Sequence, residues 1–156
     1  MNRKKIEVLI ISVLIPLLVG SVSSLLSGNM RNMYKTIKQP PLSPPAIVFP
    51  IVWTILYILM GVASYFIFNS ISEHRTKALK IYKISLIFNF FWSIIFFGIA
   101  YYLLAFVWLI VLIYIIINMM IVFYRIKPLA AYLLIPYLVW CLFAAYLNFG
   151  VYILNK

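Results

Sequence analysis

The sequence contains five long apolar stretches, and they constrain the fold more than any other feature of the chain. They cover residues 6–28, 46–70, 79–100, 103–124 and 129–154. A helix needs about 20 mainly apolar residues to cross a bilayer, and every stretch is long enough. Hydrophobic residues make up 67% of the chain, whereas soluble domains are nearer half apolar. We therefore predict an all-α membrane protein in which five transmembrane helices form a single domain over residues 1–156.

Membrane-spanning strands do not fit these stretches. Strands of a membrane barrel alternate apolar and polar residues over about 10 positions. The run LIVLIYIIINMMIVFY (residues 109–124) does not alternate. Its many Ile and Val residues favour strands in water, but in lipid the backbone must satisfy its own hydrogen bonds, which a helix does within one segment.

The charged residues predict how the chain sits in the membrane. Five spans place the two termini on opposite sides. Nine Lys and Arg residues fall on the N-terminal side and four on the other: Arg3, Lys4, Lys5, Arg75, Lys77, Lys80, Lys83, Arg125 and Lys127, against Arg31, Lys35, Lys38 and Lys156. Because Lys and Arg collect on the cytoplasmic side, we expect a multi-pass protein of the cell membrane with its N-terminus in the cytoplasm and its C-terminus outside.

The net charge of +11 would suggest nucleic acid as the partner of a soluble protein. In this chain we expect the anionic surface of the lipid bilayer instead, and no nucleic acid. The acidic residues are Glu7 and Glu73 alone, with one histidine, His74, and one cysteine, Cys141. We therefore predict no metal centre and no required cofactor. The sequence contains no nucleophile–base pair, so catalytic residues stay unknown.

Aromatic and polar side chains share faces on three of the predicted spans. The second span carries Trp53 and Tyr57, the third Asn89, Trp92, Ser93 and Phe96, and the fifth Trp140, Phe143 and Ala144. Side chains on facing helices form ligand sites in bundles, so these faces predict a pocket for a flat, largely apolar ligand. Two alternatives remain open: tryptophans also anchor helices at the membrane surface, and asparagines also join helices by hydrogen bonds.

Small residues and a C-terminal pattern suggest two further contacts. Gly20, Ser24 and Gly28 in the first span, and Gly61 in the second, predict a close approach between helices. Separately, Leu147, Tyr152 and Lys156 fit the loose pattern for cholesterol contact. A second match elsewhere in the chain shows how weak this pattern is.

Three segments resemble signatures of the TspO/translocator protein family, also called tryptophan-rich sensory proteins or peripheral benzodiazepine receptors. They read FPIVWTILYILMGVASY (residues 49–65), NFFWSIIFFG (residues 89–98) and PYLVWCLFAAYLN (residues 136–148). The resemblance implies a five-helix bundle, often a homodimer, that binds porphyrin or haem-like tetrapyrroles and also sterols. It implies that Trp53 and Trp140 line a pocket under the first loop, with Asn89 and Trp92 nearby. The implied role is a sensor, transporter or regulator of tetrapyrrole levels; the alternatives are a light-dependent porphyrin-degrading enzyme and a sterol or lipid transport protein.

The first loop departs from the family pattern. MYKTIKQPPLSPP (residues 33–45) keeps Tyr34 but has Met33 and Leu42 where the family usually has tryptophans. Gln39 replaces a lysine, and in the fifth span Ala145 replaces a usual threonine. We expect the loop to grip its ligand less tightly than in relatives.

Overall fold

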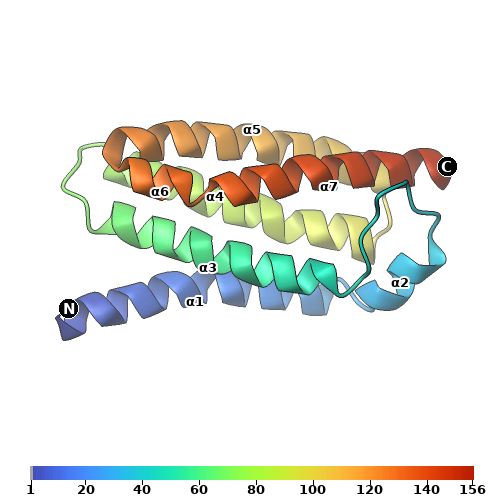
Figure 1. Cartoon of the computed structure of the whole chain (residues 1–156), viewed down its shortest axis with the longest axis horizontal. Helices are drawn as coiled ribbons and strands as arrows, with labels where there is room; N and C mark the ends of the chain where they lie inside the picture. Colours follow the sequence, from blue (N-terminus) through green and yellow to red (C-terminus); the bar gives the residue numbers. More distant parts are fainter. Residues whose placement is uncertain (1) are drawn as a thin grey trace.

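Five helices in the structure are long and apolar enough to cross a membrane. The structure is a computed structural model that describes residues 2–156, and within them it contains helices and no strands. The helices pack side by side as one bundle (Figure 1). Their bounds are α1 Arg3–Leu26, α2 Met30–Thr36, α3 Val48–Phe68, α4 Arg75–Ser93 continued by the π-helix η1 Ile94–Gly98, α5 Tyr102–Ile126, α6 Pro128–Tyr132 and α7 Ile135–Leu154. The predicted all-α membrane fold with five spans is confirmed.

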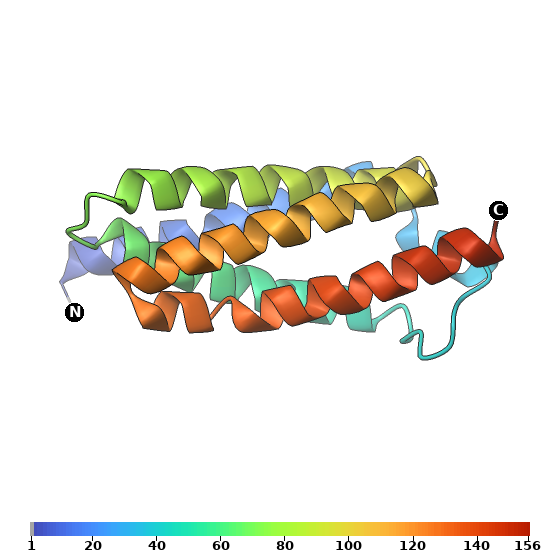
Figure 2. The same ribbon diagram turned by 90° about the horizontal axis from the view of Figure 1, so that it is seen from above.

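The two chain ends lie at opposite ends of the bundle (Figures 1 and 2). The N-terminus lies at the end that holds the α3–α4 connection. The C-terminus lies at the other end, beside α2 and the loop of residues 37–47, called here the lid loop. Short connections join α4 to α5 and α5 to α6, so successive spans run in opposite directions, as short helix–helix loops require.

Helices α1 and α3 approach closely at Gly61. A Cβ atom at this position would lie 2.5 Å from Cα of Val13 and 2.7 Å from the carbonyl oxygen of Ser12. The absence of a side chain therefore allows the two backbones to touch, as small residues do in membrane bundles. On α1 itself, Gly20 leaves room for the ring of Tyr57. Gly28 lies beyond the end of α1 with a φ of 74°, so it forms the turn into α2 and is not part of the packing face.

Two helices depart from regular α geometry near their ends. Helix α4 ends in the π-helix η1, followed by Ala100 with a φ of 59°. The fifth span is divided into α6 and α7 just before Pro136. Proline has no N–H to donate to the preceding turn, whereas it is tolerated in the first turn of a new helix. Pro136 therefore explains why α7 starts afresh at Ile135.

Candidate ligand-binding cavity

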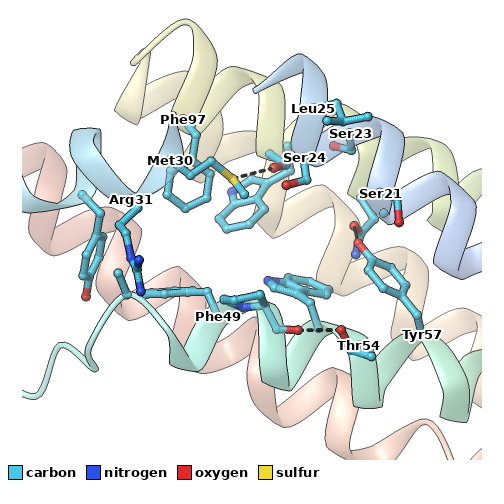
Figure 3. A pocket seen from close by; sticks show the side chains of 18 of the residues that line it. Ser21, Ser23, Ser24, Leu25, Met30, Arg31, Phe49, Thr54, Tyr57 and Phe97 are labelled. Carbon is cyan, nitrogen blue, oxygen red and sulfur yellow. Dashed lines mark hydrogen bonds between the residues drawn. The ribbon is translucent and has the colours of Figure 1, made fainter. Parts of the chain in front are cut away.

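A cavity of about 630 Å³ lies between α1, α3 and α4 and reaches up to α2 (Figure 3). Aromatic and aliphatic side chains supply its apolar surface, and hydroxyl, amide and guanidinium groups supply the polar part. The lining residues are Leu17, Gly20, Ser21, Ser23, Ser24 and Leu25 of α1, Met30, Arg31 and Tyr34 of α2, Ala46 and Ile47 of the lid loop, Phe49, Pro50, Trp53, Thr54 and Tyr57 of α3, and Asn89, Trp92, Ser93 and Phe97 of α4 and η1.

Three aromatic side chains lie in contact on one side of the cavity and form its aromatic surface, in which Trp53 is half-buried while Tyr57 and Trp92 are buried. The ring of Trp53 stacks on that of Tyr57 at 5.6 Å between centroids, and Trp92 lies 6.2 Å from Trp53. Toward α2, Tyr34 contacts Phe49 edge to face at 5.0 Å. Such a surface can stack against a flat ring because aromatic pairs are favourable at separations of about 4.5–7 Å.

The π-helix places a further ring in the cavity. In a regular α-helix, Phe96 would continue the face of Asn89 and Ser93. A π turn closes hydrogen bonds between residues five apart, and the N–H of Ile99 donates to the carbonyl of Ile94 at 2.9 Å. The wider turn shifts the face by one position, so Phe97 lines the cavity while Phe96 is buried in the core.

The opposite side of the cavity is a wall of small and hydroxyl residues from α1. The hydroxyl of Ser23 donates to the carbonyl of Phe90 at 2.7 Å and so ties α1 to α4. Ser21 donates to the carbonyl of Leu17 within its own helix at 2.8 Å. Figure 3 shows Ser21, Ser23 and Ser24 on this helix, opposite Thr54 and Tyr57 of α3.

A buried hydrogen-bond chain joins three helices at the inner end of the cavity. The hydroxyl of Tyr57 donates to Oδ1 of Asn89 at 2.9 Å, and Nδ2 of Asn89 donates to the hydroxyl of Tyr137 at 3.2 Å. A second link runs from Nε1 of Trp92 to Oδ1 of Asn148 at 3.1 Å. Because buried polar groups are costly without partners, these bonds fix the orientation of Tyr57 and Trp92.

The lid loop is held by bonds at both of its ends. The hydroxyl of Tyr34 donates to the carbonyl of Pro44 at 2.7 Å. Near the beginning of the loop, Nδ2 of Asn155 donates to the carbonyl of Lys38 at 2.8 Å, and the N–H of Lys38 donates to Oδ1 of Asn155 at 2.9 Å. Burial raises the pKa of Tyr34 above its ordinary value, against a smaller opposing effect of a hydrogen bond with Ser43. The phenol therefore stays neutral and able to donate at physiological pH.

The cavity opens to the surface between α1 and α3, and the end of this opening beside the exposed Arg31 of α2 is called here the mouth. Some of its lining residues are exposed, and they come from both helices: Ser21 and Leu25 from α1, Pro50 and Thr54 from α3. In the part of the chain that the structure describes, no group of three or more His, Cys, Asp or Glu side chains could hold a metal ion. The arrangement suits a flat organic ligand that enters from the side of the bundle.

Comparison with known proteins identifies the family. The model of the TspO/MBR family matches residues 12–154. The chain belongs to this family. It is 35% identical to the tryptophan-rich protein TspO of Archaeoglobus fulgidus, over 94% of this chain and 96% of that one. It is 34% identical to the protein of the same name from Chlorobaculum tepidum, over 98% and 99%, and 34% identical to the translocator protein of the pig, Sus scrofa, over 89% and 85%.

Five of the eight residues predicted for the site of this TspO/MBR protein line the cavity: Tyr34, Trp53, Tyr57, Asn89 and Trp92. The other three, Trp140, Phe143 and Ala144, are not among the lining residues. Trp140 packs behind Phe49, with 5.8 Å between the ring centroids. Trp140 and Phe143 also border a shallow groove on the outer side of α3 and α7.

The fifth span explains why Trp140 could not be placed from the sequence. Residues four apart on a helix differ by about 40° in direction, so Trp140 and Asn148 differ by about 80°. Asn148 points into the bundle, where Nε1 of Trp92 donates to it. Trp140, by contrast, is half-buried at the edge of the bundle.

The remaining predicted contacts also have definite positions in the TspO/MBR fold. Leu147 is buried, Tyr152 is half-buried and Lys156 is exposed, with Nζ of Lys156 5.9 Å from the ring centroid of Tyr152. Sterol contact there stays a prediction. Met33 packs against the core, whereas Leu42 is 83% exposed with a φ of 67°. Leu42 therefore lies outside the cavity, on the outer surface of the lid loop.

Sequence reasoning missed three features of the TspO/MBR cavity: the serine wall of α1, Arg31 at its mouth, and Phe97. Serines recur in the first span at Ser21, Ser23 and Ser24, and this run was the available signal for the wall. Arg31 follows the first span by only a few residues, but no pattern connects it with the aromatic faces. The position of Phe97 depends on the π-helix, which the sequence does not reveal.

Proposed function

We propose that this membrane protein binds a porphyrin or related tetrapyrrole, such as haem, in the cavity between α1, α3 and α4. In this proposal the protein acts as a sensor, transporter or regulator of tetrapyrrole levels. The observation that carries it is the surface formed by Trp53, Tyr57 and Trp92, on which a flat ring can stack. The pig relative is named a translocator protein, which agrees with a role in handling a ligand.

The size and chemistry of the cavity support a ligand of this kind. Pockets for small molecules and cofactors commonly enclose about 300–1,000 Å³ and are mainly apolar with a few placed polar groups. The volume of about 630 Å³ lies in the middle of that range. Asn89, Arg31 and the α1 serines are among the polar groups around a mainly apolar space, while the opening between α1 and α3 gives an apolar ligand a route from the bilayer.

The decisive experiment compares two tryptophans that differ in position. Trp53 lines the cavity and Trp140 does not, while both are half-buried and neither donates a hydrogen bond to residues 2–156. We expect purified wild-type protein to bind protoporphyrin, and the shift of the porphyrin absorbance band measures this binding. Trp53→Leu should weaken binding about tenfold, as the loss of about 1.4 kcal/mol of stacking predicts, whereas Trp140→Leu should change it less than twofold. Equal effects of the two variants would reject this cavity, and no binding by the wild type would reject the function.

The proposal also includes the environment of the protein. We propose that it works as a homodimer in the cell membrane, with its N-terminus in the cytoplasm and its C-terminus outside. The unequal distribution of Lys and Arg between the two ends supports this orientation.

A further inference from the structure

Arg31 is the one charged side chain among the residues that line the cavity. It lies on α2, is exposed, and follows the end of α1 by five residues. Figure 3 shows its side chain extending from α2 across the mouth of the cavity toward the start of α3. A ligand that stacks on Trp53 would therefore have its outer edge beside this guanidinium.

No acidic side chain neutralises Arg31. The two acidic residues of the chain, Glu7 and Glu73, lie near the N-terminus and in the α3–α4 connection, at the opposite end of the bundle (Figure 1). From Glu7 to the end of α1 at Leu26 there are 19 residues of helix, or about 28 Å at about 1.5 Å per residue, and Arg31 lies beyond that end. Within residues 2–156 the one close contact between a basic and an acidic side chain joins His74 and Glu73. The guanidinium is thus free to bind an anion from outside the protein.

We infer that Arg31 binds a carboxylate on the edge of the ligand and makes the cavity selective for acidic flat rings over neutral ones. The inference rests on the proposed function, because it concerns the same ligand in the same cavity. A guanidinium matches a carboxylate in shape and can form two parallel hydrogen bonds with it. In this arrangement the apolar ring lies against Trp53 and Trp92, while the acidic group stays at the wet mouth of the cavity and is not desolvated.

The exposure of Arg31 sets the size of the expected effect. Ion pairs in contact with water contribute up to about 1 kcal/mol, which corresponds to about a fivefold change in affinity. Arg31 should therefore control selectivity more than total affinity, since the ring supplies most of the apolar contact.

The test uses two probes with the same ring. Protoporphyrin IX carries two carboxylates, and its dimethyl ester carries none. Binding of both is measured in a neutral detergent, where lipid phosphate is absent, for wild type, Arg31→Gln, Arg31→Lys and the control Lys35→Gln. Lys35 lies on the same helix and gives the same change in charge but does not line the cavity. The expected result is an acid-over-ester preference of about fivefold in the wild type and Lys35→Gln. That preference should be lost in Arg31→Gln with ester binding unchanged, and partly kept in Arg31→Lys.

Each other outcome is decisive. An unchanged preference in Arg31→Gln, or equal weakening of both probes, would overturn the role of Arg31 while leaving the cavity as the porphyrin site. Failure of the wild type to bind either probe would overturn the proposed function and this inference with it. A repeat in bilayer discs containing phosphatidylglycerol separates the two sources of an oxyanion. If Arg31→Gln lowers only the retention of that lipid, the partner of Arg31 is a headgroup phosphate and the inference is wrong.

Discussion

At the scale of single residues, Asn89 holds the inner end of the cavity together. It accepts a hydrogen bond from Tyr57 of α3 and donates one to Tyr137 of α7, and it is 2% exposed. One amide therefore satisfies two hydroxyls that would otherwise be buried without partners. The sequence left two roles open for this asparagine: joining helices by hydrogen bonds or lining a ligand pocket. In the structure Asn89 does both.

Replacing Asn89 by leucine should destabilise the bundle by about 1–2 kcal/mol, because membrane hydrogen bonds contribute about 0.6–1.7 kcal/mol each and two hydroxyls lose their partner. The measurement is thermal unfolding in detergent. Asn118→Leu is the matched control, since Asn118 donates only to the carbonyl of Tyr114 in its own helix. A loss of stability that is as large in Asn118→Leu as in Asn89→Leu would contradict this account.

At the scale of helices, the attachment of α1 decides whether the cavity exists. Helix α1 supplies the serine wall, yet it is the least buried of the five spans. Only 11% of its most apolar 18-residue stretch is buried inside the bundle. It approaches α3 closely at Gly61, where the backbones touch. The close approach predicted at Gly61 is confirmed, but its partners on α1 are Ser12 and Val13, while Gly20 and Ser24 of the predicted stripe line the cavity. The sequence could not predict that the C-terminal half of α1 leaves a ligand-sized cavity beside α3, because this depends on the angle between the two helices.

The substitution Gly61→Ala should destabilise the protein by about 1–3 kcal/mol, since overpacked sites cost roughly that amount. The added methyl group would meet backbone atoms of Val13 and Ser12, which cannot move aside as a side chain can. Gly98→Ala is the control, because the nearest atom to its Cβ would be 3.6 Å away. Thermal unfolding and porphyrin binding should both change in Gly61→Ala alone. Equal tolerance at the two glycines would show that α1 and α3 are less tightly apposed.

The helices also show how far sequence reasoning reaches. All five spans were predictable from length and hydrophobicity, with ends within a few residues of those in the structure. Helix α2 was not predicted, because seven residues are too few to give a clear apolar period. The break before Pro136 and the π-helix η1 were also missed, since both alter hydrogen bonding within a stretch that remains uniformly apolar.

At the scale of the whole molecule, charge is distributed along the long axis. The basic residues around the N-terminus, the α3–α4 connection and the α5–α6 junction gather at one end, and the lid loop and C-terminus lie at the other (Figure 1). The cavity mouth, with Arg31, belongs to the second end. In the proposed orientation this mouth lies near the outer surface of the membrane.

Cysteine labelling of intact cells tests that orientation. Lys156→Cys should react with a membrane-impermeant maleimide in intact cells, whereas Lys77→Cys should react only after permeabilisation. Both positions are exposed, and the natural Cys141 is buried and so gives a low background. The reverse labelling pattern would place the N-terminus outside and the cavity mouth toward the cytoplasm.

The bonds between Lys38 and Asn155 have a consequence for how the protein is made. These partners are 117 residues apart in the chain. Ribosomes add about 5–20 residues per second, so the start of the lid loop waits roughly 6–23 s for Asn155, whereas the bond from Tyr34 to Pro44 joins residues only ten apart. During this interval the aromatic surface of α3 is already synthesised while one end of the lid loop lacks its partner. The attachment at Lys38 therefore forms only when synthesis is nearly complete, and a nascent chain that stalls before Asn155 lacks it.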